Sequence, residues 1–250
     1  MMGLIPKLSD PKKVIDTNHT FLVYGPPGCG KTTLMAGLTD SLIIDTEKGS
    51  TLQRAHRIEC KDWVTFQNVV KELSRRPPEF KNICIDTVGP LLNSCMNYVS
   101  KNIGVGHPSE AQYGKGWHLI KETVKTVFLQ LQHLPCNVWF VLHSQVKKIE
   151  GVTDYDYTQP ELPGFLENLF LGLCDFIFMV DMEAKAERDA DGKMIGRKNT
   201  RILRTKPNKF WMAKDRLVET TLPEKIDLNA EALMLALHYC FNNGNDTTDD

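Results

Sequence analysis

Residues 24–33 read YGPPGCGKTT, and this stretch decides the fold. Its spacing, G-x-x-x-x-G-K-[ST], is typical of a loop whose backbone N–H groups surround the phosphates of a nucleoside triphosphate. Glycines let the backbone turn those groups inward, and the following helix adds its dipole. An apolar run, FLVYG at 21–25, precedes the loop, and a helical pattern follows it. The sequence therefore predicts a P-loop that binds a triphosphate, and the rest of the chain must indicate what the triphosphate drives.

Individual residues of the loop and of two later runs have predicted roles. We expect Lys31 to reach the β and γ phosphate oxygens and the Thr32 hydroxyl to bind Mg²⁺. A second magnesium partner is expected in Asp86, at the end of the apolar run NICID. Glu47 follows the run LIID and is expected to orient the attacking water, with Asp45 as the alternative. The predicted nucleotide-binding residues are Gly25, Pro26, Pro27, Gly28, Cys29, Gly30, Lys31, Thr32 and Thr33.

The chain alternates between strand and helix patterns. Short apolar runs of the kind that is buried on both faces of a parallel sheet predict strands at 21–25, 42–46, 82–87, 138–145 and 176–183. Between them, apolar residues at three-to-four spacing predict helices at 32–40, 62–76, 88–101 and 117–134. This alternation predicts a doubly wound α/β sheet that is mostly parallel.

The C-terminal third has a different pattern. Asp191 and Gly192 lie between two polar-flanked stretches and predict a hairpin or an antiparallel extension of the sheet. Asn229 is expected to cap a last helix. We expect one domain at 19–241, preceded by an arm at 1–18 and followed by a disordered acidic tail at 242–250.

Composition excludes several classes of protein. The net charge of −1 excludes a globally basic surface, so a nucleic acid or an acidic lipid would need a local patch of cations. The seven cysteines lack the spacing of zinc or redox pairs and suggest reduced thiols in the cytosol. The histidines lack metal-ligand spacing and are expected to be structural or surface residues. The most apolar window, 165–180, is interrupted by polar residues and too short for a bilayer, so we expect no membrane span and no export.

The position of the catalytic glutamate separates families of P-loop ATPases. Ring ATPases of the AAA+ kind usually carry it directly after the strand aspartate, where this chain has Thr87 after Asp86. The segment IIDTE instead resembles the second strand of RecA-like recombinases, and VWFVLHSQV resembles their strand that ends in a polar γ-phosphate sensor, here Gln145. The ordered motifs GPPGCGKTT, IIDTE, NICIDT, FVLHSQV and RTKPNKFWMAKDR are similar to those of phage-encoded RecA-like ATPases that act as single-strand annealing proteins or minimal recombinases.

This resemblance spans about residues 19–241 and has several implications. It implies a RecA-like P-loop NTPase fold, ATP and Mg²⁺ as ligands, and assembly into a homo-oligomeric ring or filament. Single-stranded DNA is the implied partner, a single-strand DNA-binding protein is a further candidate partner, and the location is cytoplasmic, in a bacterial host for a phage protein. Basic residues of the late region would act on a neighbour's nucleotide, and spacing does not choose among Lys206, Lys209, Lys214 and Arg216.

Cations and aromatic residues agree with a DNA partner. Residues 185–216 hold eleven Lys or Arg against four Asp or Glu, an excess of seven positive charges that suits a phosphate backbone. A solvated charged hairpin is the alternative interpretation. Two segments, 104–116 and 146–171, are expected to be long loops that contact DNA or a neighbouring subunit. Base-stacking candidates within them are Tyr113, Tyr155, Tyr157 and Phe165.

The sequence therefore predicts a RecA-like ATPase that uses its nucleotide state to control binding or annealing of single-stranded DNA. Two other classes of protein stay open. An AAA+ helicase loader or remodelling ATPase would act on a protein partner, and Thr87 after Asp86 argues against it. A small-molecule kinase would need an arginine-rich lid in the middle of the chain, whereas the basic residues of this chain come late.

Overall fold

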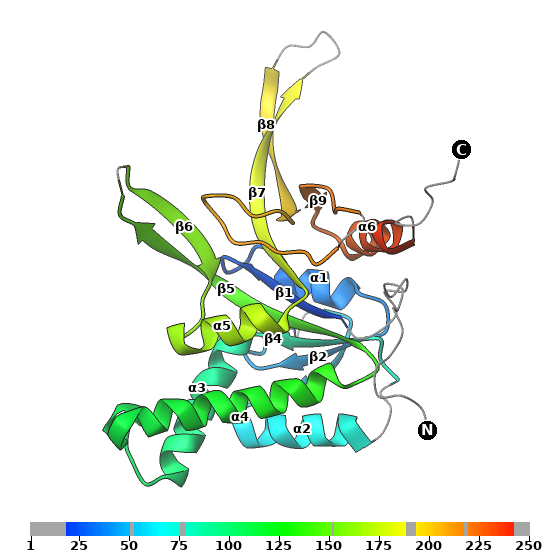
Figure 1. Ribbon diagram of the computed structural model, residues 1–250. Helices are drawn as coiled ribbons and strands as arrows, with labels where there is room; N and C mark the ends of the chain where they lie inside the picture. Colours follow the sequence, from blue (N-terminus) through cyan, green and yellow to red (C-terminus); the bar gives the residue numbers. More distant parts are fainter. Residues whose placement is uncertain are drawn as a thin grey trace, which may run out of the picture.

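A computed structural model describes residues 19–50, 53–75, 79–151, 153–188, 194–217 and 220–242. One sheet runs through the molecule, with helices on both of its faces (Figure 1). Its strand order is β3-β2-β4-β5-β1-β7-β8-β9, and β6 pairs with β5 beside this series. The predicted arm at 1–18 lies outside the described residues, as does the predicted tail apart from Asn242, which belongs to the last helix.

The central strands are parallel, as predicted, because their residues are buried on both faces. The parallel strands are β1 (Thr20–Gly25), β2 (Ser41–Asp45), β3 (His56–Glu59), β4 (Asn82–Asp86), β5 (Asn137–Ile149) and β7 (Phe176–Arg188). Strands β6 (Tyr155–Pro160), β8 (Met194–Arg204) and β9 (Lys225–Asp227) pair antiparallel. The predicted doubly wound sheet with a C-terminal antiparallel extension is confirmed.

Helices cover the two faces of the sheet unequally (Figure 1). One face packs against α2 (Trp63–Arg75), α3 (Val88–Asn102), α4 (Lys115–Gln132) and α5 (Gly164–Leu173). The other face packs against α1 (Lys31–Gly37) and α6 (Ala230–Asn242). The predicted cap is present, since Asn229 accepts from the Ala232 N–H at 2.7 Å, and Asp62 caps α2 in the same way by accepting from the Thr65 N–H at 2.7 Å.

Aromatic rings fill the core on both faces. Beneath α1 and α6, the Phe21 ring stacks on Trp139 at 3.9 Å and on Phe176 at 4.9 Å. On the opposite face, Phe128 stacks on Phe140 at 4.8 Å. Burying each such side chain contributes roughly 1.5–3 kcal/mol to the free energy of unfolding. These rings hold the strands rigidly behind the sheet edge where the motifs lie.

Two segments differ from their prediction as long loops. In 146–171, β5 continues to Ile149, the chain returns as β6, and α5 begins at Gly164. The hairpin was missed because it extends past the rest of the sheet (Figure 1) and is mostly exposed, so its sequence lacks a continuous apolar run. Residues 104–116 contain two 3₁₀ turns, η1 (Pro108–Glu110) and η2 (Gln112–Gly114), and α4 already begins at Lys115.

Strand β3 was also missed in the sequence, because HRIE is a short, largely exposed edge strand without an apolar run.

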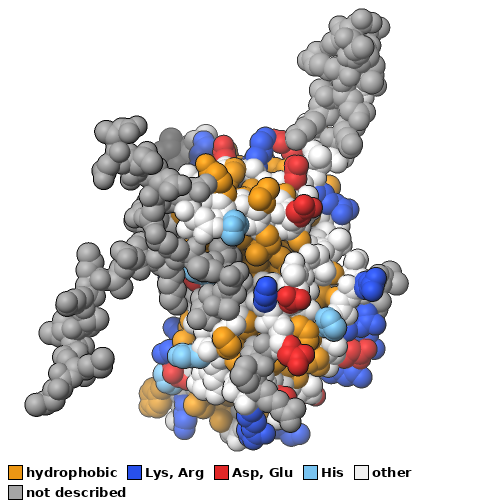
Figure 2. Space-filling view, turned by 90° about the vertical axis from the view of Figure 1, so that its right-hand side faces the viewer, with side chains coloured by type: hydrophobic (Ala, Val, Ile, Leu, Met, Phe, Trp, Pro, Cys, Tyr) orange, Lys and Arg blue, Asp and Glu red, His pale blue; other side chains and the backbone are white. Residues whose placement is uncertain are grey.

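The surface of the fold carries mixed charge. On the face that Figure 2 shows, acidic and basic side chains lie interspersed among apolar and polar ones, as a net charge of −1 suggests. None of the described helices is both long and apolar enough to span a bilayer.

Candidate active site

The P-loop joins β1 to α1 and keeps its shape through glycine. Gly28 and Gly30 have φ angles of 73° and 105°, which glycine adopts without steric cost. A Cβ atom on Gly25 would lie 2.8 Å from the carbonyl oxygen of Val180, so no side chain fits there. The loop thus approaches strand β7 closely, and Gly28 and Gly30 have no side chain of their own to cover their backbone N–H groups.

Strand register brings the predicted site residues to the same edge of the sheet. Gly25 lies beside His143, and Asp45 lies beside Asp86, because the carboxyl ends of parallel strands meet there. A pocket of about 370 Å³ opens at this edge. It is lined by Pro27, Gly28, Gly30, Lys31, Thr32, Thr33, Glu47, Gly49, Gln53, Asp86, Thr87, His143 and Arg201. Gly25, Pro26 and Cys29, also predicted to bind the nucleotide, do not line it.

Lys31 is part of the P-loop structure as well as of the pocket. Its side chain is only 5% exposed, and its ammonium donates to the carbonyl oxygens of Gly25 and Pro26, both at 2.8 Å. The side chain of Cys29, a buried residue of the same loop, has its Sγ 3.7 Å from Lys31 Nζ. We expected the lysine charge to serve the phosphates alone, whereas these bonds also fasten the loop.

The side chains of Asp86 and Thr32 fit a magnesium ion. Burial raises the pKa of the Asp86 carboxyl above its usual range, and a hydrogen bond from the Thr32 side chain and the charge of Lys31 oppose this shift. Among the described residues, Asp86 Oδ2 is buried without a hydrogen-bond partner. A buried carboxylate oxygen beside a hydroxyl is the kind of ligand pair that Mg²⁺ prefers. A bound Mg²⁺ would neutralise phosphate charge there, held by Thr32 and Asp86.

Glu47 faces the pocket together with a histidine that the sequence analysis missed. His143 Nε2 lies 3.6 Å from Glu47 Oε2, and both side chains are partly exposed. His143 was assigned to structural or surface residues, but it lines the pocket. Its position had a signal, since His143 and Gln145 are two residues apart and so share one face of β5. The contact with His143 restricts the orientations of the Glu47 carboxylate.

Asp45, the alternative catalytic carboxylate, has a structural task. It is 2% exposed and accepts hydrogen bonds from the backbone N–H groups of Glu47, Gly49 and Ser50 at 3.1, 3.2 and 2.9 Å. The Ser50 hydroxyl donates to it as well, at 2.5 Å. Burial acts to raise the pKa of Asp45, but these bonds outweigh it and the pKa is lowered. Asp45 therefore orients the turn that carries Glu47 and does not line the pocket.

Gln145, the predicted phosphate sensor, lies in an adjoining pocket of about 430 Å³. Its Nε2 donates to the Pro160 carbonyl oxygen on β6 at 3.2 Å. Glu47 and His143 line both pockets and so connect Gln145 to the P-loop. The side chain of β5 that reaches the P-loop pocket is that of His143.

The basic residues predicted to act on a neighbour make contacts within their own chain. Lys214 donates to the carbonyl oxygens of Leu171 and Cys174 at 2.6 and 2.7 Å, and burial, followed by the charge of Arg216, lowers its pKa. Arg216 pairs with Asp175 at 2.9 Å, and Lys206 pairs with Asp215. The ammonium of Lys209 lies 4.9 Å above the Phe210 ring. None of Lys206, Lys209, Lys214 and Arg216 lines the P-loop pocket.

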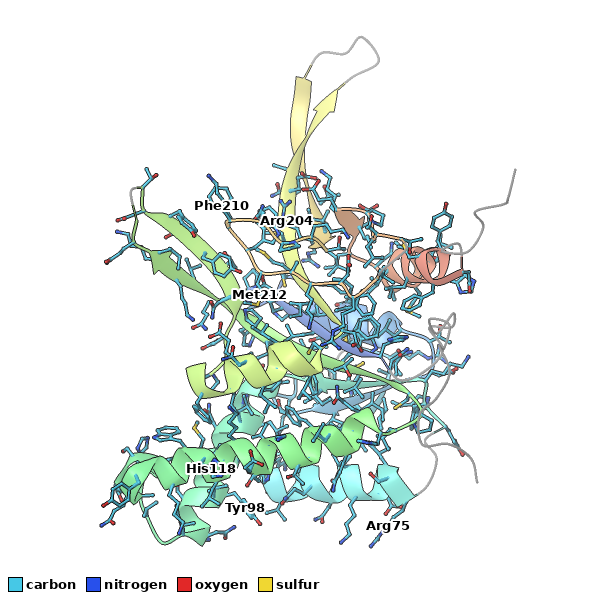
Figure 3. All side chains as sticks on the ribbon, in the orientation of Figure 1. Arg75, Tyr98, His118, Arg204, Phe210 and Met212 are labelled. Atoms are coloured by element: carbon cyan, nitrogen blue, oxygen red, sulfur yellow. The ribbon has the colours of Figure 1, made fainter. Side chains whose placement is uncertain are left out.

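Aromatic and basic side chains lie beside the β5–β6 hairpin. The segment at 206–212 runs along β6, where the Thr158 N–H donates to the Phe210 carbonyl oxygen at 2.8 Å. The Tyr155 ring lies 6.3 Å from that of Phe210, which is 44% exposed. Figure 3 shows Phe210 between the two hairpins, β5–β6 and β7–β8, with Arg204 close by. We call Tyr155, Lys209 and Phe210 the aromatic ledge.

Of the other predicted stacking residues, Phe165 and Tyr113 lie elsewhere, and Tyr157 lies on β6 two residues from Tyr155. Phe165 belongs to α5, and its ring packs against Trp117 at 5.0 Å as part of the core margin. Burial raises the pKa of Tyr157, which is partly covered on β6. Tyr113 is fully exposed in η2, between α3 and α4.

A family model described as an AAA domain matches residues 17–217. The chain belongs to this AAA domain family. Over 86 residues the chain is 35% identical to cell division protein C of Sulfolobus acidocaldarius, a match that covers 33% of this chain and 22% of that protein. The chain therefore spans about a fifth of the length of that relative.

Among solved structures, the AAA domain is similar to the crystal structure of the RadB recombinase. The TM-score is 0.44 with 13% identity, over 87% of this chain and 90% of that chain. The P-loop, the mostly parallel sheet and its antiparallel extension confirm the predicted α/β, RecA-like P-loop NTPase fold class. Family and fold together make the chain an NTPase domain.

Proposed function

We propose that the chain is an ATPase that binds single-stranded DNA and uses its nucleotide state to control annealing or strand pairing in recombination. ATP is the substrate and Mg²⁺ the cofactor, held by Thr32 and Asp86. The support is the set of side chains in one pocket: a buried lysine in the loop, an aspartate with one unpartnered carboxylate oxygen among the described residues, and a glutamate that faces the pocket beside a histidine. These groups match what phosphoryl transfer to water requires.

Each residue has a part in the hydrolysis that we propose. Lys31 neutralises charge on the outer phosphates from a position that two carbonyl oxygens fix. Glu47 orients the attacking water and accepts its proton, because its carboxylate faces the pocket from the turn that Asp45 holds. His143 limits the orientations of Glu47 from 3.6 Å away.

The observation that carries the DNA half of the proposal is the continuity of strand β5. His143 lines the phosphate pocket, Gln145 bonds to the base of β6, and the same strand then becomes the hairpin beside the aromatic ledge. A shift of His143 on nucleotide binding would therefore move the hairpin directly. Aromatic faces next to cations are how proteins bind single strands without reading their sequence.

Assembly of the chain into a ring or a filament is part of the proposal. The four basic residues predicted to act on a neighbour do not line the P-loop pocket of their own chain: Lys206, Lys209, Lys214 and Arg216. A neighbouring subunit would have to present its nucleotide to them. A single-strand DNA-binding protein is a further candidate partner that the resemblance suggests.

The proposal is tested by the ATPase rate with and without single-stranded oligonucleotides, at several salt concentrations. We expect stimulation by single strands and a DNA affinity that falls steeply with salt. Phe210→Ala should weaken DNA binding by roughly 5- to 100-fold, the range for one lost base stack. Tyr239→Ala is the matched control, since Tyr239 is an exposed aromatic residue on α6, away from the aromatic ledge. Equal effects of the two variants would contradict the aromatic ledge.

A second candidate follows from the family itself. An AAA-type helicase loader or remodelling ATPase would act on a protein partner, and the family description as an AAA domain favours it. An ATPase rate that ignores oligonucleotides of every kind, in a chain that still hydrolyses ATP, would support this candidate over the recombination protein.

A further inference from the structure

Arg201 on β8 is the cation that the antiparallel extension directs to the P-loop pocket. A Cβ atom on Gly30 would lie 3.2 Å from Arg201 Nη1, so the guanidinium lies against the loop. Pairing on both sides fixes its strand: Arg201 lies opposite Met182 on β7, and its carbonyl oxygen accepts from the Leu228 N–H at 3.0 Å. The sheet therefore positions this side chain independently of any neighbouring subunit.

The charge of Arg201 is not compensated within the described part of the chain. Its guanidinium makes no hydrogen bond or ion pair there, whereas nearby cations of the extension do. Arg204 pairs with Asp181 at 2.7 Å, and Lys225 pairs with Glu183 at 2.8 Å. An arginine that faces a phosphate-binding loop without a carboxylate partner suits a phosphate, which its planar fork binds through two parallel hydrogen bonds.

We infer that Arg201 binds the outer phosphates of the nucleotide in its own P-loop. This inference rests on the proposed function only in requiring that the loop binds a nucleoside polyphosphate. It differs from the role predicted for the four late basic residues, because the contact lies within one chain. It also joins the nucleotide to the foot of the β7–β8 hairpin, since Arg201 and Met182 are paired across its two strands.

The test compares ADP and AMP binding by calorimetry for the wild-type chain, Arg201→Ala and Arg201→Lys. We expect Arg201→Ala to lose about tenfold or more in ADP affinity, as for one charge-assisted contact, with a weaker salt dependence. AMP affinity should change much less, because AMP lacks the outer phosphates. Arg201→Lys should recover part of the ADP affinity. The melting temperature should stay the same, because the side chain is exposed and unpaired.

Two results would overturn the inference while leaving the proposed function intact. Unchanged ADP affinity in Arg201→Ala would show that the guanidinium does not meet the phosphates. Equal losses for ADP and AMP would assign it to the base or ribose instead. A wild-type chain that binds neither nucleotide would overturn the proposed function itself, so the two failures differ.

Lys225→Ala is the matched control, because it removes a cation from the neighbouring strand β9 that is already paired with Glu183. It should leave ADP affinity unchanged, and a loss equal to that of Arg201→Ala would overturn the inference. A mixture of Arg201→Ala and Lys31→Ala chains tests whether the contact lies within one chain. No recovery of ATP turnover is expected, since each change damages the P-loop site of the chain that carries it and no chain in the mixture has an intact site. Recovery would place Arg201 on a neighbour's nucleotide.

Discussion

The P-loop and the late basic segment at 206–216 are both predicted to contact a nucleotide, the second in a neighbouring subunit, and in the structure their side chains have different surroundings. The loop residues lie around one pocket, and the register of the parallel strands places residues at the ends of β2, β4 and β5 at the same pocket. The late cations spread over different contacts: a carboxylate for Lys206, two carbonyl oxygens for Lys214, and an aromatic ring for Lys209.

The difference lies in how each region is specified. A loop of ten residues determines its own geometry, so its motif predicts its chemistry. The position of a cation on the antiparallel extension depends on pairing with strands that are distant in sequence. Charge counted along the sequence therefore indicated that the region is basic, without indicating which residue faces the phosphates.

The largest expected effect on nucleotide binding is that of Lys31→Ala. The change removes a buried charge from the centre of the loop, and ATP affinity should fall on the order of 10²-fold or more, as for a lost buried phosphate contact. It also removes the bonds to Gly25 and Pro26, so the loop itself should exchange its amide hydrogens faster. Lys81→Ala, at an exposed lysine paired only with Asp40, is the control. Retained ATP affinity in a folded Lys31→Ala chain would contradict the P-loop assignment.

The next effect concerns action on a neighbour. Among the four candidates, Lys209 has no carboxylate or carbonyl partner in the described chain, so we expect Lys209→Ala to lower turnover on the order of 10³-fold without weakening ATP binding. Mixing it with Lys31→Ala chains should restore part of the activity, because a loaded site then meets an intact cation. Lys125→Ala, on α4, should behave as wild type. If no mixture recovers turnover for Lys206, Lys209, Lys214 or Arg216, the late segment has no such role.

Glu47→Gln should separate binding from hydrolysis. The amide cannot accept a proton from water, so turnover should fall on the order of 10²-fold or more while ATP affinity is kept. Single-turnover and binding measurements distinguish the two quantities. Glu59→Gln changes a glutamate at the end of the neighbouring strand β3 and should have little effect. An unchanged rate in Glu47→Gln would move the catalytic role to another group of the pocket.

Much of the fold was predictable from the sequence, for a physical reason. Strands buried on both faces need continuous apolar runs, and β1, β2 and β4 have them. Strand β3 is largely exposed and β6 is buried only at Gln159 and Pro160, so neither has a continuous apolar run. Helix α5 lies in an apolar window whose pattern did not distinguish helix from strand.

The candidate site was predictable where its residues are close to the loop or end a buried strand. Lys31, Thr32, Glu47 and Asp86 all line the pocket. The same reasoning could have predicted His143, since the period of two along β5 places it on one face with Gln145. It could not have predicted Arg201, because the position of Arg201 depends on the register between β7 and β8, which no local pattern determines.

Asp45→Asn tests the support beneath Glu47. The lowered pKa of Asp45 means that its ionised form stabilises the fold above the unfolded-state pKa of about 3.9, and that this stability is lost as the pH falls through the lower folded-state value. The variant should lose roughly 1–3 kcal/mol at pH 7, and its deficit in melting temperature should shrink toward pH 3. Asp40→Asn, at an exposed aspartate, is the control. A deficit that is the same at both pH values would contradict this account of Asp45.

The smallest expected effect separates a structural lysine from its exposed neighbour. Lys214→Met keeps the aliphatic stem but removes the donor from the carbonyl oxygens of Leu171 and Cys174, which end helix α5. We expect a loss of about 1–2 kcal/mol in the free energy of unfolding, below that of Asp45→Asn because burial of the charged lysine opposes its bonds. Lys209→Met is the matched control, since its ammonium contacts only a ring, and it should unfold as wild type. Denaturant titration of both variants measures the difference. Equal stability would mean that the bonds of Lys214 contribute nothing to the fold, and Lys214 would then rank with Lys209 as a cation available to a neighbouring nucleotide.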